Sequence, residues 1–218
     1  ELAYGKVLEI YRDDALETSS TNPFKGNLDL DKFQKVIDEY GPERVSFVRM
    51  EATTNLIGGQ PFSMENLRGV QRIAAKYDIP VVIDCSLISE NAYFIQQREQ
   101  GYANTSIAEI VREMMSYADL IYLSGRKSTC VRGGLMATKH EKYFEQLKAW
   151  LPVYEGFITY GGMSSKEIEA MAVGLREMVD PDVASSSADL IEYFVNEMVK
   201  RGIPAVTPPG GLAGHVAA

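Results

Sequence analysis

Two short apolar runs decide the fold of this chain: Val81-Val82-Ile83-Asp84 and Leu120-Ile121-Tyr122-Leu123, the second continuing into Ser124-Gly125-Arg126-Lys127. A brief run of this kind is typical of a buried strand in a parallel sheet. Between the runs, residues 106–117 have apolar residues at helical spacing behind a capping serine. Because a strand, a helix and a second strand in this order give parallel strands with a right-handed crossover, we expect an α/β domain.

The same alternation extends in both directions along the chain. Helical spacing of apolar residues and short β-rich runs predict the remaining elements. The expected helices span 28–39, 63–78, 106–117, 142–150, 165–179 and 184–201, and the expected strands span 45–54, 79–84, 120–123, 133–138 and 210–218. The stretch 180–187 is expected to be a turn between two helices. Ser63 is predicted to cap a helix, with Asn66 in the position that glutamate takes in a capping box.

Composition narrows the class of protein. The 218 residues include 30 acidic and 22 basic side chains, which gives a net charge of −8. This balance argues against a nucleic acid or an anionic membrane as partner, because both attract a basic face. No apolar run reaches membrane-spanning length, the first residues lack the order of a signal peptide, and Cys85 and Cys130 keep no metal-ligand spacing. We therefore expect a cytoplasmic protein without a metal site.

Two ionisable side chains stand near the ends of the quoted strands. Asp84 closes the first, and Lys127 follows the second after a Ser-Gly turn. Ligands of open α/β sheets collect at such ends. A carboxylate and an amine there suit pyridoxal 5′-phosphate, which needs a lysine for its Schiff base and an acid for its pyridine nitrogen. Residue types alone leave other interpretations open: a turn or cap aspartate, a solvated lysine, or a nucleotide-binding fold, although no G-x-G-x-x-G follows a strand.

Longer motifs resemble a known family. The segment Asn55-Leu56-Ile57-Gly58-Gly59-Gln60-Pro61-Phe62-Ser63-Met64 is similar to N-L-A-G-G-Q-P-V-S-M of tyrosine phenol-lyase and tryptophanase, which are β-eliminating amino-acid lyases. Further matches follow in the same order at residues 90–95, 106–111, 116–119, 153–156, 160–162, 169–172 and 174–177. The similarity runs from about Asn22 to the end, which is far more than one motif gives by chance.

This resemblance implies a fold, a cofactor and roles for single residues. The implied fold is the large domain of a fold-type-I pyridoxal-phosphate enzyme (aspartate-aminotransferase-like), a mostly parallel mixed sheet flanked by helices. Lys127 matches the Schiff-base lysine, Asp84 the partner of the pyridine nitrogen, and Asn55 the ligand of the phenolic oxygen. Ser86 is expected under the ring, and Ser124 at the phosphate. The full set of residues expected to bind the cofactor is Asn55, Asp84, Ser86, Ser124, Arg126 and Lys127.

Three positions depart from the family pattern. Leu87 stands where the family has an arginine beside the phenolic oxygen, so one positive charge is lost there. Arg126 replaces a lysine and keeps the charge on a planar head group. Arg132 stands at the family's monovalent-cation site, and we hypothesise that its guanidinium replaces potassium. A steep rise in activity with added potassium would contradict this.

The implied reaction is β-elimination from an L-amino acid of the aromatic or S-substituted cysteine type, giving aminoacrylate and then pyruvate and ammonia. Leu87 favours carbon–sulfur substrates such as cysteine or thiocysteine, because a thiolate or persulfide leaves more easily than phenol or indole. Two alternatives stay open: a degenerate, non-catalytic scaffold, and another reaction on the same fold such as β-replacement or transamination.

The resemblance also predicts the domain organisation and the partners of the chain. Residues 1–180 are expected to form the central portion of the cofactor-binding large domain, and 181–218 a helix and strand leading into a C-terminal small domain. The chain is expected to be a fragment, because the family's phosphate loop, stacking aromatic residue and carboxylate-binding arginine lie outside it. The expected partners are a small amino-acid substrate and further copies of the chain, in a homodimer or homotetramer.

Overall fold

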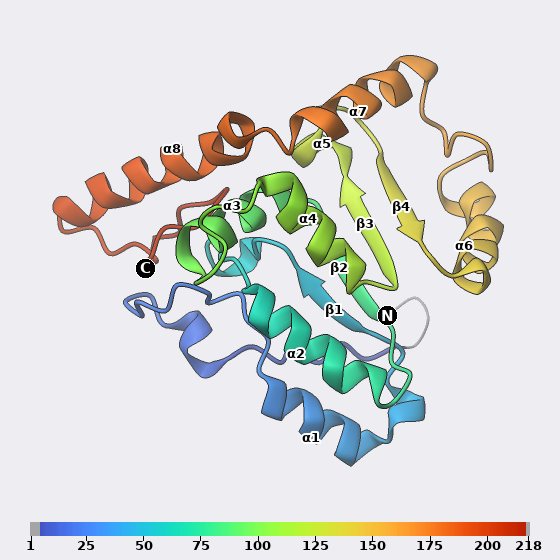
Figure 1. The fold of residues 1–218 in the computed structure, drawn as a ribbon, viewed down its shortest axis with the longest axis horizontal. Coiled ribbons are helices and arrows are strands. Elements are labelled where there is room, and N and C mark those ends of the chain that lie inside the picture. The colour runs from blue at the N-terminus through green and yellow to red at the C-terminus, as the bar shows by residue number, and fades with distance from the viewer. Residues whose placement is uncertain (1–4, 217–218) are drawn as a thin grey trace.

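The structure, a computed structural model, describes residues 5–216 and is built around a four-stranded sheet (Figure 1). The strands are β1 (Val48–Glu51), β2 (Val81–Asp84), β3 (Leu120–Ser124) and β4 (Gly134–Thr138), and they lie in that order. β1, β2 and β3 are parallel, as the alternation of strands and helices predicts, and β4 is antiparallel to β3. The predicted mostly parallel mixed sheet is confirmed.

The direction of each strand follows from its connection. Helices join β1 to β2 and β2 to β3, as parallel pairing requires. Only the segment 125–133 joins β3 to β4, so the chain turns back beside β3. The helices are α1 (Leu30–Tyr40), α2 (Met64–Ala75), α3 (Ile88–Arg98), α4 (Ile107–Ser116), α5 (Gly125–Ser128), α6 (Glu141–Tyr154), α7 (Ser165–Glu177) and α8 (Pro181–Lys200).

Side-chain caps fix where helices begin. Ser63 accepts a hydrogen bond from the Asn66 backbone at 3.1 Å and starts α2, as predicted. Asn66 does not complete a capping box: its side chain accepts from the Leu28 N–H at 2.9 Å and donates to the Leu28 carbonyl at 2.8 Å. Asn66 therefore ties α2 to the segment before α1. At α4, Ser106 and Glu109 form the full reciprocal box.

The sequence pattern does not predict α3. Its capping position, Leu87, has no side-chain acceptor for the first free N–H groups. Two of its buried positions, Ser89 and Asn91, are polar and interrupt the apolar spacing. The helix is held by tertiary contacts with α4 and α8 rather than by a local signal.

The last part of the chain also differs from expectation. The stretch 180–187, expected to be a turn, is helical from Pro181 onward, because Asp180 caps α8 and Pro181 occupies its first turn. The final strand expected over 210–218 is reduced, within the described residues, to one bridge between Ala205 and Val216. Residues 217–218 lie outside the described part. Between residues 5 and 216, no helix combines the length and the apolarity that crossing a bilayer requires.

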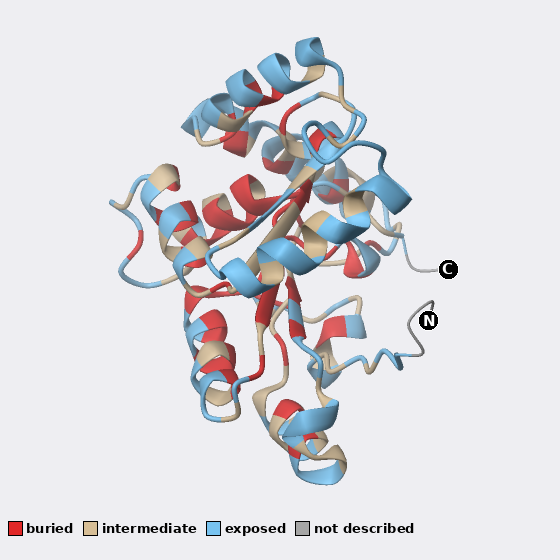
Figure 2. Cartoon of the chain, turned by 90° about the vertical axis from the view of Figure 1, so that its right-hand side faces the viewer, coloured by how far each residue is buried: buried red, intermediate tan, exposed pale blue. Residues whose placement is uncertain are grey.

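The two faces of the sheet differ in character. Side chains alternate along each strand, so every second residue points to the same face. One face packs on the main core, and its residues include Val48, Met50, Val81, Ile83, Ile121 and Leu123. α2 and α4 lie in front of this face in Figure 1, and buried residues gather along the strands and the inner sides of helices in Figure 2. The opposite face carries Arg49, Glu51, Asp84, Tyr122 and Met136 and is more open.

A buried amide fixes the loop after β1. Asn91 of α3 is 0% exposed; its Oδ1 accepts from the backbone N–H groups of Thr53 and Phe62, each at 3.1 Å. Its Nδ2 donates to the Phe62 carbonyl at 2.9 Å. Thr53 has a φ of 57°, unusual for a β-branched residue, and its hydroxyl donates to the Leu87 carbonyl at 2.9 Å. Both ends of the loop that carries Asn55 are thus tied to one helix.

Replacing Asn91 by alanine should therefore cost much of the fold's stability. Two buried N–H groups and one carbonyl would lose their partner, so we expect the free energy of unfolding to fall by about 2–4 kcal/mol. Urea unfolding of the full-length protein measures this. Asn104→Ala, at an exposed position, is the matched control, and an Asn91→Ala effect as small as that of the control would contradict the role of the amide.

Candidate active site at the strand ends

Three side chains meet where β1, β2 and β3 end. Glu51, Asp84 and Tyr122 are direct neighbours in the register of the sheet. Directly paired residues of parallel strands point to the same face, so these three form a polar row on the open face. Asp84 Oδ1 also accepts a hydrogen bond from the Ser86 N–H at 3.0 Å. The sequence indicates no role for Glu51 or Tyr122, because strand register cannot be read from it.

Ser86 joins the ends of β2 and β3. Its hydroxyl accepts from the Ser124 N–H at 3.0 Å, and its carbonyl accepts from the Ser128 hydroxyl at 2.6 Å. Its side chain is buried. Ser86 therefore holds α5, which carries Lys127, against the turn that follows Asp84.

The remaining predicted ligands lie exposed at this edge. Arg126 and Lys127 are exposed on α5. Asn55 is exposed at the start of a 3-10 turn (Asn55–Ile57), and its N–H donates to Glu51 Oε1 at 3.3 Å. The structure thus brings Asp84, Ser86 and Ser124 into one network and leaves the amine, guanidinium and amide side chains open beside it.

Glu90 is a further ionisable group near Lys127. It lies in the first turn of α3 and accepts a hydrogen bond from the Ser187 hydroxyl of α8 at 3.3 Å. Burial raises the pKa of Glu90, while its own backbone N–H, Ser187 and the charge of Lys127 act in the opposite direction. In the sequence Glu90 has the properties of an ordinary first-turn acid. The packing of α8 and of the segment at Gly211 against α3 buries it, which is why sequence reasoning missed it.

Leu87 and Arg132, two of the positions that depart from the family pattern, lie in different surroundings. Leu87 is 2% exposed, so its side chain belongs to the interior rather than to the open edge. Arg132 is exposed near the start of α7. Hydrogen bonds from Ser164 lower the pKa of Glu167, and the charge of Arg132 lowers it further. Within residues 5–216, no three His, Cys, Asp or Glu side chains gather as a metal site requires.

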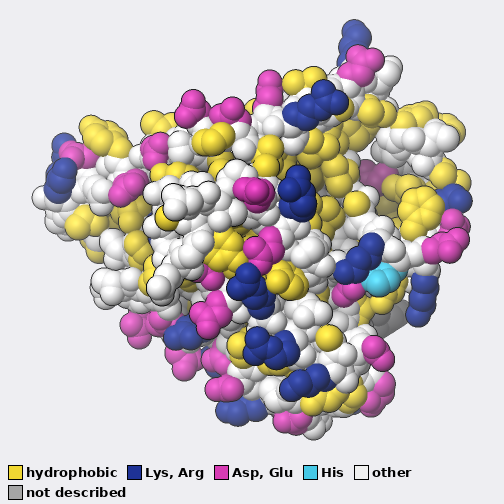
Figure 3. Space-filling model, viewed as in Figure 1, with side chains coloured by type: hydrophobic (Ala, Val, Ile, Leu, Met, Phe, Trp, Pro, Cys, Tyr) yellow, Lys and Arg dark blue, Asp and Glu magenta, His cyan; other side chains and the backbone are white. Residues whose placement is uncertain are grey.

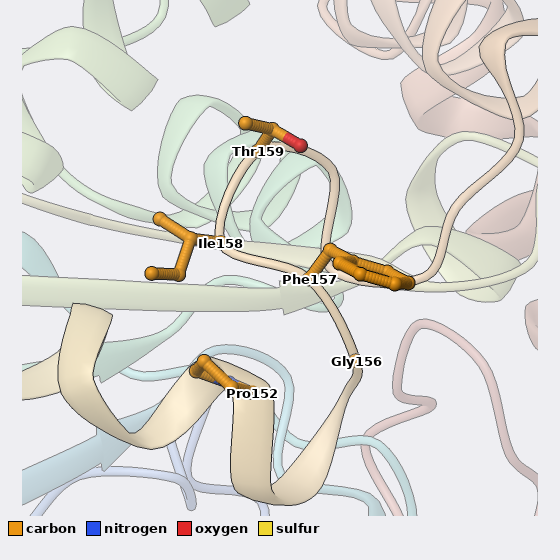
Figure 4. A pocket seen from close by; sticks show the side chains of 5 residues that line it. All are labelled: Pro152, Gly156, Phe157, Ile158 and Thr159. Carbon is orange, nitrogen blue, oxygen red and sulfur yellow. The ribbon is translucent and has the colours of Figure 1, made fainter.

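A hollow elsewhere on the surface has no reactive groups. It lies in the connection from α6 to α7 and is lined by Pro152, Gly156, Phe157, Ile158 and Thr159 (Figure 4). Apolar side chains dominate its lining, and none of these residues is ionisable. The strand ends, where a carboxylate and hydroxyl groups share one network and an exposed amine lies on the following helix, are therefore the candidate active site.

Comparison with solved structures defines the fold class. A protein of Listeria monocytogenes EGD-E described as an L-allo-threonine aldolase superposes with a TM-score of 0.64 at 19% identity, covering 87% of this chain and 47% of that one. An aromatic amino acid beta-eliminating lyase/threonine aldolase of Exiguobacterium sp. 255-15 superposes with a TM-score of 0.57 at 18% identity, covering 78% and 44%. The fold is that of fold-type-I pyridoxal-phosphate enzymes, as predicted.

The chain belongs to the beta-eliminating lyase family, which it matches over residues 3–218. A tyrosine phenol-lyase of Intrasporangium calvum is 43% identical over 214 residues, covering 98% of this chain and 45% of that protein. A tyrosine phenol-lyase of Nostoc punctiforme is 41% identical over 214 residues, covering 98% and 46%. The chain spans about half the length of the curated relatives it matches. The family resemblance read from the motifs is confirmed, and this family in general implies pyridoxal phosphate.

The raised pKa of Glu90 predicts a pH-dependent stability. The folded protein binds a proton there more tightly than the unfolded chain does. The stability contributed by this group is therefore complete below its ordinary pKa of 4.5 and is lost as the pH rises through the raised value. Glu90→Gln removes that loss, so the variant should gain stability relative to the wild type as the pH rises from about 4 to about 8.

Urea unfolding of the full-length protein at several pH values checks this expectation. Glu39→Gln, at an exposed position of α1, is the control and should follow the wild type. A difference between Glu90→Gln and wild type that stays constant across the pH range would show that Glu90 is not the responsible group.

Proposed function

We propose that this chain forms the cofactor-binding part of a pyridoxal-phosphate lyase that eliminates the β-substituent of an L-amino acid, giving aminoacrylate and then pyruvate and ammonia. The observation that carries the proposal is the placement of Asp84 and Lys127 at neighbouring strand ends, joined through Ser86, Ser124 and Ser128. Membership of the beta-eliminating lyase family supports the reaction class. The retained set of donors argues against a degenerate scaffold.

The donors at the strand ends fit pyridoxal phosphate. Asp84 offers a carboxylate for the pyridine nitrogen, Lys127 an amine for the aldehyde, and Asn55 an amide for the phenolic oxygen. Ser124 and Arg126 offer a hydroxyl and a guanidinium, which suit a phosphate. When bound, the cofactor supplies an electron-withdrawing ring that stabilises negative charge at the substrate α-carbon.

The chain's own residues would then act as follows. The Ser86 N–H keeps Asp84 oriented at the end of β2. The Lys127 amine would accept the proton from the substrate α-carbon. Glu90 stabilises the ammonium group that results, because the charges of Glu90 and Lys127 attract each other.

Lys127→Ala tests the assignment directly. Full-length wild-type protein given pyridoxal phosphate should develop the visible absorption band of a lysine-bound cofactor. The variant should lack this band and lose β-elimination activity by about 100- to 10,000-fold. Lys139→Ala, at an exposed lysine, should retain both. Persistence of the band in Lys127→Ala would show that another lysine holds the cofactor.

The leaving group is a separate question. Expulsion of phenol or indole requires the aromatic ring of the substrate to be tautomerised first, whereas a thiolate or persulfide leaves directly. Leu87 removes a cation beside the phenolic oxygen of the cofactor, and its buried side chain supplies no polar substitute. We infer that the site favours carbon–sulfur substrates of the cysteine or thiocysteine type, although the relatives described above are named tyrosine phenol-lyases.

Steady-state assays with tyrosine, tryptophan and S-substituted cysteines separate the two leaving-group classes. We expect kcat/KM to be about tenfold or more higher for the sulfur substrates, which corresponds to a barrier lower by about 1.4 kcal/mol. Pyruvate is the common product and gives one readout for all substrates. Robust release of phenol or indole without turnover of sulfur substrates would overturn this inference.

An exposed apolar segment supports an oligomer. The end of α6 and the loop after it carry apolar side chains that are each more than half exposed: Trp150, Val153, Tyr154, Phe157 and Ile158. Figure 3 shows hydrophobic side chains exposed in the region of α6 and α7. Contiguous exposed apolar surface marks an interaction site, so we propose a homodimer or homotetramer. A single-protomer molar mass of the full-length protein in solution would contradict it.

Three assignments from the sequence stay proposals. Residues 1–180 would form the large domain and 181–218 would lead into a small domain, with α8 packed on α3. Arg132 would replace potassium, which its charge beside Glu167 supports. A cytoplasmic location is supported by the free thiols of Cys85 and Cys130, because reducing compartments keep thiols unpaired.

A further inference from the structure

A guanidinium on the open face of the sheet binds a phenol that lies beside Asp84. Arg49 of β1 donates from Nη1 to Tyr122 Oη of β3 at 3.0 Å. This bond passes over β2, because β2 lies between those two strands. Tyr122 is also the register neighbour of Asp84 on β2. A phenol that accepts from an arginine keeps its own proton for a second partner.

The protonation states suit this arrangement. Burial raises the pKa of Tyr122 to about 12, and the Asp84 carboxylate contributes by its charge and by hydrogen bonding, although Arg49 acts in the opposite direction. Tyr122 therefore keeps its proton in neutral solution and can direct it to the neighbouring Asp84 carboxylate. Burial alone would lower the pKa of Arg49, but Tyr122, Glu51 and Asp84 together raise it. Arg49 thus stays charged and cannot accept the phenolic proton.

The polar row on the open face also reaches the loop of Asn55, the residue expected to bind the phenolic oxygen of the ring. Arg49 Nη2 donates to Glu51 Oε2 at 2.7 Å, and Glu51 Oε1 accepts from the Asn55 N–H at 3.3 Å. One arginine therefore connects the carboxylate at the end of β2 with the loop that begins at Asn55. The residues expected to bind the pyridine nitrogen and the phenolic oxygen share a single polar support.

We propose that Tyr122, held by Arg49, is a positioning residue for Asp84: its phenolic hydroxyl keeps the carboxylate aimed at the place expected for the pyridine nitrogen of the cofactor. This inference rests on the proposed function. Without the phenol, Asp84 keeps only the Ser86 N–H as a hydrogen-bond donor within this network and is free to rotate toward Arg49. The carboxylate would then be shared between the guanidinium and the ring.

Tyr122→Phe in the full-length protein removes only the hydroxyl. We expect pyridoxal phosphate to bind about tenfold more weakly, as measured by titration of the visible band. Tyr117→Phe is the matched control, because Tyr117 likewise accepts a hydrogen bond from an arginine, Arg68 Nε at 3.2 Å, away from the strand ends. Circular dichroism and Tm establish that both variants are folded.

An analogue of the cofactor with a CH group in place of the ring nitrogen separates positioning from a merely structural role. Because the analogue offers Asp84 nothing to pair with, Tyr122→Phe and the wild type should bind it equally. Equal weakening toward the cofactor and the analogue would overturn the proposal, as would Tyr122→Phe that binds the cofactor like the wild type. Arg49→Met should reproduce the loss, and Arg49→Lys should restore part of it by keeping the charge.

Failure of the proposed function gives a different result. In that case the wild type develops no visible band with pyridoxal phosphate, or Lys127→Ala keeps it, and the role of Tyr122 is overturned as well. A wild-type band that Lys127→Ala abolishes, together with unchanged binding by Tyr122→Phe, overturns the role of Tyr122 alone.

Discussion

The buried amide of Asn91 is the interaction on which the geometry of the site depends. The loop from Thr53 to Phe62 leaves regular strand structure at a positive φ and returns through two glycines. Within it, Thr54 and Gln60 form one antiparallel bridge. Asn91 meets both ends of the loop through backbone hydrogen bonds in a fully buried position. A buried donor without a partner costs more than an ordinary hydrogen bond contributes, which makes this conformation strongly specified. Since α3 begins at Ile88, one short turn after Asp84, the amide also influences where Asn55 lies relative to Asp84.

The parallel register of the sheet provides the second constraint. Pairing of β1, β2 and β3 places Glu51, Asp84 and Tyr122 in one row. Arg49, two residues before Glu51 on β1, reaches across β2 to Tyr122. One guanidinium and two carboxylates leave this group with one excess negative charge. A protonated pyridine nitrogen would neutralise that charge, so the row is electrostatically suited to a cationic ring before any cofactor enters. The guanidinium of Arg49 is bound to Tyr122 and Glu51 and offsets part of this negative charge. It leaves the edge of the Asp84 carboxylate that would face the ring unoccupied.

Much of this could be predicted from the sequence, and the limits have physical causes. The strands and most helices have clear periodicity, and Asp84 and Lys127 are visible as ionisable residues after apolar runs. Helix α3 is missed because its buried Asn91 serves the loop rather than the core. The start of α8 is missed because its serine-rich first turns look like a turn by composition. Arg49, Tyr122 and Glu90 could not be found, because their roles arise from strand register or from the packing of a helix almost a hundred residues away.

The protein provides more hydrogen-bonding groups near the expected pyridine nitrogen of the cofactor than near its phenolic oxygen. On the nitrogen side, Asp84 has the Ser86 N–H, the Tyr122 phenol and, behind it, Arg49. On the side of the phenolic oxygen, Asn55 stands without the arginine that Leu87 replaces, and the Leu87 side chain is buried. Electron withdrawal by the ring would therefore depend mainly on a well-supported pyridinium. That suffices to stabilise charge at the α-carbon. A well-supported pyridinium does nothing for the separate tautomerisation that an aromatic leaving group requires. The unequal support of the ring is therefore an argument for a leaving group that departs unaided, such as a thiolate.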